Sequence, residues 1–209
     1  MQDIDVLMLH FLDTEDVESE YPIRHYPGHV LFEKTGVELI SLNKSKSDLQ
    51  HVPCDLSLQA ISDYLGMTGF LEDGELPLSH IIKFLSSTKL DGPLKVQIPH
   101  GANIVLSRKK WKIILKEFSN NKWIVVSDAE GRGIENFITE SNHVSFETDH
   151  LSTFAVVGYC DKNSLSAFKR MKVMAFCSET GVGKDLAVRL YCFDDCEWSF
   201  EVSFQKPKS

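Results

Sequence analysis

Apolar and polar residues alternate through most of this chain, and that period of two constrains its fold more than any other feature. In residues 94–99, Leu94, Val96 and Ile98 alternate with Lys95 and Gln97. Successive side chains of a strand point to opposite faces, so the run predicts a half-buried strand. Similar runs occur at 29–42, 56–61, 111–118, 122–126, 143–148, 168–176, 186–195 and 197–204.

Turn-forming residues separate these runs at intervals of roughly ten residues, as in all-β proteins. Asp91-Gly92-Pro93 and Asn120-Asn121 are examples. Helical periodicity is scarce, which argues against alternating β and α units. We therefore predict an all-β fold, an antiparallel β-sandwich. Its buried side chains should include Leu94, Val96, Ile98, Ile113, Leu115, Phe154 and Val156.

The pattern divides the chain of 209 residues into parts. Residues 1–27 form an acidic lead segment, and 28–158 form the sandwich. Residues 159–167 are polar and predict a linker, after which 168–209 form a partial second β domain. A piece of that size seldom buries enough apolar surface to be stable alone, so it should lean on the sandwich or leave apolar surface exposed. We expect its side chains Trp198, Phe200, Val202 and Phe204 to pack on one side.

Composition restricts the function. The net charge of −8 argues against nucleic-acid binding, because affinity for a polyanion comes largely from Lys and Arg. No run approaches the roughly 18 apolar residues of a membrane span, and there is no signal-peptide pattern at the start. The five cysteines include no CxxC pair, which favours reduced thiols and a cytoplasmic location.

Neither a cofactor nor a metal is expected. The stretch "SETGVGKD" (178–185) lacks the first glycine and the final Ser or Thr of a phosphate loop, and it lies between predicted strands. The dispersed histidines have no spacing typical of metal ligands. His100, between Pro99 and Gly101 at the end of a strand, is expected to hydrogen-bond the backbone at a tight corner.

Two groups of segments resemble known domains. "GHVLFEKTGVELISL" (28–42), "PLKVQIPHGA" (93–102) and "KKWKIILKEF" (109–118) resemble the ZU-five domain of netrin receptors, ankyrins and the death-domain protein PIDD. "FKRMKVMAF" (168–176) and "LAVRLYCFDD" (186–195) resemble the first strands of the UPA domain that follows it.

The resemblance implies a non-catalytic module for protein interaction in signalling and apoptosis. Its partners would be proteins or adjacent domains of the death-domain type. It also implies a cytoplasmic location, either for the chain by itself or for the intracellular part of a membrane receptor in a longer form.

The stretch "TDHLSTFAVVG" (148–158) raises an alternative function. It reads as one strand, in which His150 and Ser152 share a face. In PIDD and in function-to-find domains, which share the ZU-five and UPA plan, the chain cuts itself before a serine in a similar place. The resemblance implies self-cleavage between Leu151 and Ser152. A serine needs a base to take its proton, and His150, His143 or His100 are the candidates.

Overall fold

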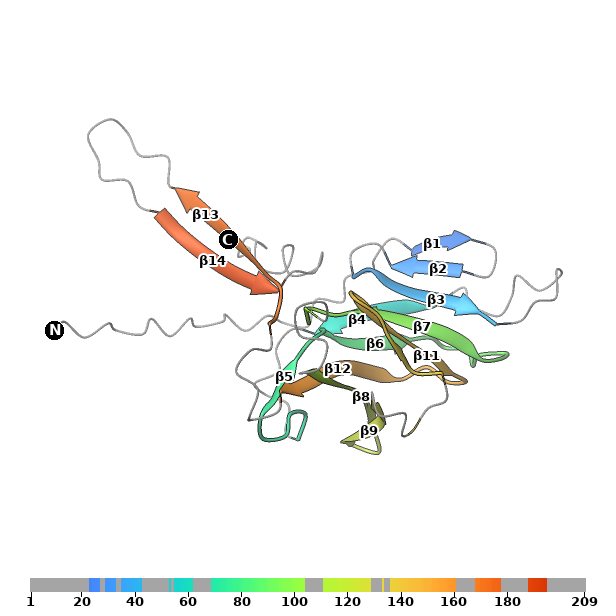
Figure 1. Cartoon of the computed structure of the whole chain (residues 1–209). Helices are drawn as coiled ribbons and strands as arrows, with labels where there is room; N and C mark the ends of the chain where they lie inside the picture. Colours follow the sequence, from blue (N-terminus) through green and yellow to red (C-terminus); the bar gives the residue numbers. More distant parts are fainter. Residues whose placement is uncertain are drawn as a thin grey trace.

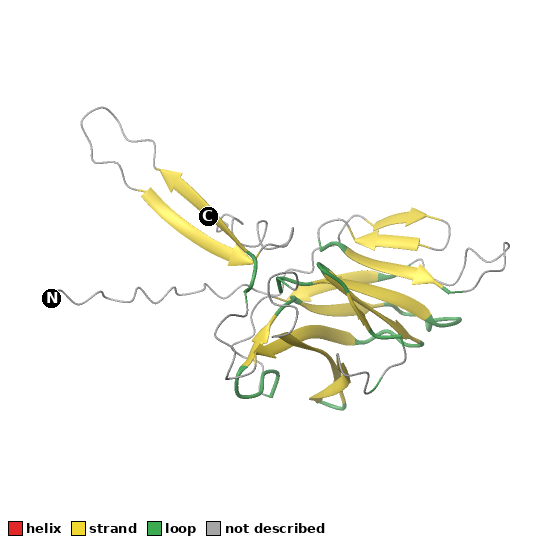
Figure 2. Cartoon of the chain, viewed as in Figure 1, coloured by secondary structure: helices red, strands yellow, loops and turns green. Residues whose placement is uncertain are grey.

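All regular elements of the described chain are strands, as the alternation predicts (Figure 2). The computed structural model describes residues 23–26, 29–32, 35–42, 53, 55–61, 69–103, 111–128, 133, 136–160, 168–177 and 188–194. The strands form two six-stranded sheets and a separate hairpin (Figure 1). All strand pairings are antiparallel.

The first sheet has the order β1-β2-β3-β7-β11-β10. Its strands are β1 (Ile23–Tyr26), β2 (His29–Phe32), β3 (Val37–Ser41), β7 (Leu94–Pro99), β11 (His143–Thr148) and β10 (Ile138–Thr139). β7 lies between β3 and β11, and its burial alternates strictly along the strand. β1 falls within residues 1–27, the segment expected to lead into the sandwich, and it extends this sheet by pairing with β2.

The second sheet has the order β4-β6-β12-β8-β9, and β5 also pairs with β12. Its strands are β4 (Ser57–Ile61), β5 (Glu75–Pro77), β6 (Ile81–Leu85), β8 (Trp111–Ser119), β9 (Lys122–Asp128) and β12 (Thr153–Cys160). β12 is central, because β5, β6 and β8 all pair with it. Both of its faces are buried, which accounts for its continuous apolar run from Phe154 to Val157.

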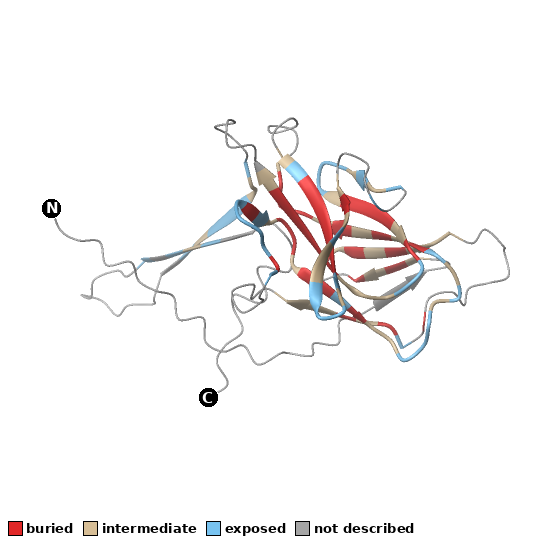
Figure 3. Cartoon of the chain, turned by 90° about the horizontal axis from the view of Figure 1, so that it is seen from below, coloured by how far each residue is buried: buried red, intermediate tan, exposed pale blue. Residues whose placement is uncertain are grey.

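The main core lies between the two sheets, where buried residues gather (Figure 3). The prediction of its members is confirmed, since each of the following is at most 2% exposed: Leu94, Val96, Ile98, Ile113, Leu115, Phe154 and Val156. Aromatic rings connect the layers. Phe154 of the second sheet lies 5.0 Å, between ring centroids, from Phe146 of the first sheet. Such pairs add to the stability gained from area burial.

A smaller core covers the outer face of the second sheet. Residues 69–75 cross this face, and Phe70 is fully buried there against Trp123, with ring centroids 4.8 Å apart. Ala155 and Val157 of β12 belong to the same cluster of buried side chains. The sheet is therefore buried on both sides over part of its area.

The C-terminal part contains the hairpin of β13 (Met171–Cys177) and β14 (Val188–Asp194), which extends away from the sandwich (Figure 1). The register places Val173 and Leu190 on one face, and these side chains are 65% and 72% exposed. The predicted packing of Trp198, Phe200, Val202 and Phe204 lies outside the described residues.

Backbone hydrogen bonds attach the base of the hairpin to the sandwich. Asn103 N–H donates to the Phe168 carbonyl at 2.8 Å, and Arg170 N–H donates to the Gly101 carbonyl at 2.7 Å. The Lys169 ammonium donates to a carbonyl of β5 at 2.8 Å. Residues 168–170 thus connect the hairpin to the sandwich.

Candidate functional site

The segment with the candidate serine is a corner between the two sheets. The prediction of one strand from Thr148 to Gly158 is wrong, because β11 ends at Thr148 and β12 begins at Thr153. The Thr148 hydroxyl accepts the His150 N–H at 3.3 Å and donates to the His150 carbonyl at 2.9 Å. Such local side-chain bonds favour a turn over a strand. His150 and Ser152 therefore do not share a strand face.

His150 lies between two carboxylates. Its Nε2 is 2.9 Å from Glu117 Oε1, and its Nδ1 is 2.8 Å from Asp149 Oδ1. Glu117 comes from β8, and its side chain is 10% exposed. The contact therefore links the corner to the middle of the second sheet.

These contacts raise the pKa of His150 above its ordinary value. The hydrogen bond to Asp149 is the largest cause; burial of the ring opposes it, and the hydrogen bond to Glu117 adds to it. Carboxylates only accept hydrogen bonds, so the protonated ring donates from both nitrogens. An imidazolium that donates from both nitrogens has no lone pair with which to accept a serine proton.

Ser152 forms hydrogen bonds with the backbones of two strands, β8 and β6. Its Oγ donates to the Phe118 carbonyl of β8 at 3.5 Å, and its own carbonyl accepts the Phe84 N–H of β6 at 3.1 Å. No histidine of the described residues is a hydrogen-bond partner of its Oγ. The structure thus brings Ser152 and His150 into one corner without a hydrogen bond between the hydroxyl and the imidazole.

The two alternative bases lie at the opposite end of the first sheet. His143 begins β11 and pairs with Pro99, whereas the corner follows the last residue of that strand. Five residue steps along a strand span about 16 Å. His143 and His100 are therefore too far away to accept a proton from Ser152 directly.

His100 has the structural role that was expected of it. Its Nε2 hydrogen-bonds the Glu140 carbonyl at 3.1 Å, and its backbone N–H donates to the Asn142 carbonyl at 2.9 Å. Burial is the main cause that lowers its pKa to about 4. A neutral histidine therefore fixes the corner after β7.

Glu117 is a site residue that the sequence analysis missed. It lies 33 residues before His150, in a strand where charged residues alternate irregularly with apolar ones. The charge at position 117 on the core-facing side of β8 was the one available signal, because a buried carboxylate requires a partner.

No group of three or more His, Cys, Asp or Glu side chains is placed to hold a metal ion in the part of the chain that the structure describes. The same residues include no helix long and apolar enough to cross a membrane. In the comparisons with known proteins, no family model and no curated protein matches the chain.

Proposed function

We propose that this chain is a protein-interaction module of the ZU-five and UPA type, which serves signalling and does not act on external substrates. The arrangement of His150 carries the proposal. Both of its ring nitrogens face carboxylates, and the Ser152 hydroxyl faces a carbonyl. The two side chains that self-cleavage would use as base and nucleophile instead connect the corner to its neighbouring strands.

The hairpin supports an interaction role. Large apolar side chains on it are exposed: Met171, Val173, Val188 and Leu190. An isolated two-stranded hairpin is marginally stable in water, and a contiguous apolar surface marks a contact site. A neighbouring domain or a protein partner that covers this face would account for the exposure of these apolar side chains.

Intact mass spectrometry tests this proposal against self-cleavage. We expect the purified, folded chain to remain one species of 23.7 kDa after several days near neutral pH, because no basic side chain among the described residues is hydrogen-bonded to Ser152 Oγ. The alternative requires two fragments, separated between Leu151 and Ser152, whose masses add up to the intact mass plus one water.

If fragments appear, three variants test their origin. Ser152→Ala should abolish the cut, and Ser152→Cys should retain part of it, because a thiolate is the stronger nucleophile. His150→Ala should slow the cut by about 10²–10⁴-fold if His150 is the base. Fragments that also form in Ser152→Ala would point to a contaminating protease.

A further inference from the structure

A cluster of hydrogen bonds joins two connections at the edge of the second sheet. β4 pairs with β6 antiparallel, so the residues before β4 and those after β6 meet at the same end of the pair. Asp55 lies two residues before β4, and Ser86, Ser87 and Thr88 follow β6 directly. These four residues form the Asp55 cluster, in which Asp55, Ser87 and Thr88 are exposed.

The Asp55 carboxylate is the acceptor for the whole cluster. It accepts the Ser86 hydroxyl at 2.8 Å, the Thr88 hydroxyl at 3.2 Å and the Ser87 N–H at 2.6 Å. It also accepts the Ser87 hydroxyl, and this bond is the largest cause that lowers the pKa of Asp55 well below its ordinary value. The carboxylate is therefore ionised at neutral pH, and it holds residues 86–88 through groups that donate to it.

The sequence after Thr88 has the charge pattern of a kinase substrate. The β6–β7 connection (residues 86–93) contains no helix or strand, and Asp91 stands three residues after Thr88. Both side chains are exposed. Kinases select substrates partly by charge, and basic groups in the substrate groove of an acid-directed kinase can pair with a carboxylate at this spacing. Ser86 and Ser87 have no carboxylate three residues on, so Thr88 is the hydroxyl that such a kinase would select.

We propose that Thr88 is phosphorylated by an acid-directed serine/threonine kinase and that the phosphate releases the β6–β7 connection from Asp55. The kinase transfers the γ-phosphoryl group of ATP to Thr88 Oγ1. The bond between Oγ1 and the γ-phosphorus forms, the bond between that phosphorus and the ADP oxygen breaks, and the hydroxyl proton passes to the base of the kinase. The inference goes beyond the proposed interaction function and does not depend on it.

Phosphorylation changes the Asp55 cluster in two ways. Thr88 Oγ1 loses the proton that it donates to Asp55, and the phosphate carries a charge of about −1.5 to −2 at neutral pH. The phosphate would lie beside the carboxylate, because Oγ1 and Asp55 Oδ1 are 3.2 Å apart. Residues 86–91 supply one basic side chain, Lys89, against these two anions. Repulsion between the phosphate and Asp55 therefore opposes the closed cluster.

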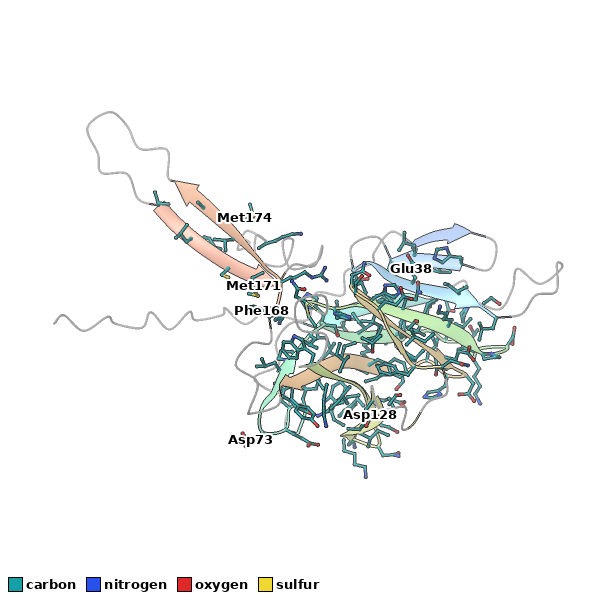
Figure 4. All side chains as sticks on the ribbon, in the orientation of Figure 1. Glu38, Asp73, Asp128, Phe168, Met171 and Met174 are labelled. Atoms are coloured by element: carbon teal, nitrogen blue, oxygen red, sulfur yellow. The ribbon has the colours of Figure 1, made fainter. Side chains whose placement is uncertain are left out.

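Phosphoryl transfer to the full chain tests the site. The purified chain is incubated with ATP, Mg²⁺ and a purified kinase that prefers a carboxylate three residues after the hydroxyl, and peptide mass spectrometry locates the phosphate. We expect phosphate on Thr88. Asp91→Asn should slow transfer to Thr88 at least about 10-fold, because it removes the charge that the kinase recognises. Asp73→Asn removes the same charge from an exposed position at the turn before β5 (Figure 4) and should leave the rate unchanged.

Amide hydrogen exchange at Ser87, measured by NMR, tests the release. The Ser87 N–H donates to Asp55, so its exchange should become at least about 10-fold faster in the phosphorylated chain. Thr88→Glu should also accelerate this exchange, and the uncharged Thr88→Gln should not. In a chain that carries Asp55→Asn, the further change Thr88→Glu should have no effect, because the repulsion requires both charges.

The site would be overturned if Thr88 stays unmodified while the same kinase phosphorylates an acidic control peptide, or if Asp91→Asn leaves the rate at Thr88 unchanged. Equal exchange at Ser87 with and without the phosphate would overturn the release. These outcomes are distinct from failure of the proposed function, which the intact mass of the unmodified chain decides.

Discussion

Phe154→Ala is expected to lower the free energy of unfolding by about 3–5 kcal/mol, the usual loss for a buried phenylalanine. Phe154 is 1% exposed and lies between Phe84 and Phe146, so its removal leaves a cavity at the contact between the two sheets. For a chain of this length the loss corresponds to roughly 6–20 °C in melting temperature. Urea denaturation and thermal melts measure both quantities.

Phe168→Ala is the matched control. The side chain of Phe168 is 47% exposed at the base of the hairpin, and its carbonyl accepts hydrogen bonds from the Asn103 N–H and the Trp111 Nε1–H. Truncation there should cost at most about 1 kcal/mol, as at most surface positions. Equal losses for the two variants would contradict a core between the sheets.

Glu75→Ala is expected to cost about 3–5 kcal/mol, because it leaves the buried Lys116 ammonium without its counter-charge. Lys116 is 2% exposed, and its other acceptor is the Phe70 carbonyl at 2.9 Å. Glu75 also accepts the Glu72 N–H at 2.7 Å, so the same change loosens the turn before β5. The free energy of unfolding from urea titration measures the loss.

The double variant Glu75→Leu with Lys116→Met separates the charge effect from packing. It removes both buried charges and keeps apolar volume, so its stability should return close to that of the original chain. The single variants Glu75→Leu and Lys116→Met complete the comparison. If the double variant loses as much free energy of unfolding as the two single variants added together, the two side chains act independently, which contradicts a buried ion pair.

The alternation of residues was sufficient to predict the all-β fold and the members of the main core. It could not reveal the corner at 149–152, since His150 and Ser152 continue the period of Phe154 and Val156 while the chain crosses between sheets. Periodicity describes which side a residue faces. It does not describe where the backbone bends.

The outer face of the second sheet shows a second limit of prediction from the alternation of residues. Lys116 occupies a position that alternation assigns to solvent, yet it is buried beneath the segment that contains Phe70. That segment is 46 residues earlier in the chain, so the covering contact has no local signal. Glu117 and His150 are 33 residues apart, so the charge on the core-facing side of β8 did not identify its partner.

The central claim is that His150 joins the corner to β8 and does not serve Ser152 as a base. NMR titration of the His150 ring in the full chain tests it most directly, with Glu117→Gln as the comparison. We expect a pKa above the ordinary value of 6.5 that falls in the variant. The stabilisation from this contact is then fully present below about pH 6.5 and is lost as pH rises through the folded-state pKa. A His150 pKa at or below 6.5 that Glu117→Gln leaves unchanged would contradict the claim and make the ring available to Ser152.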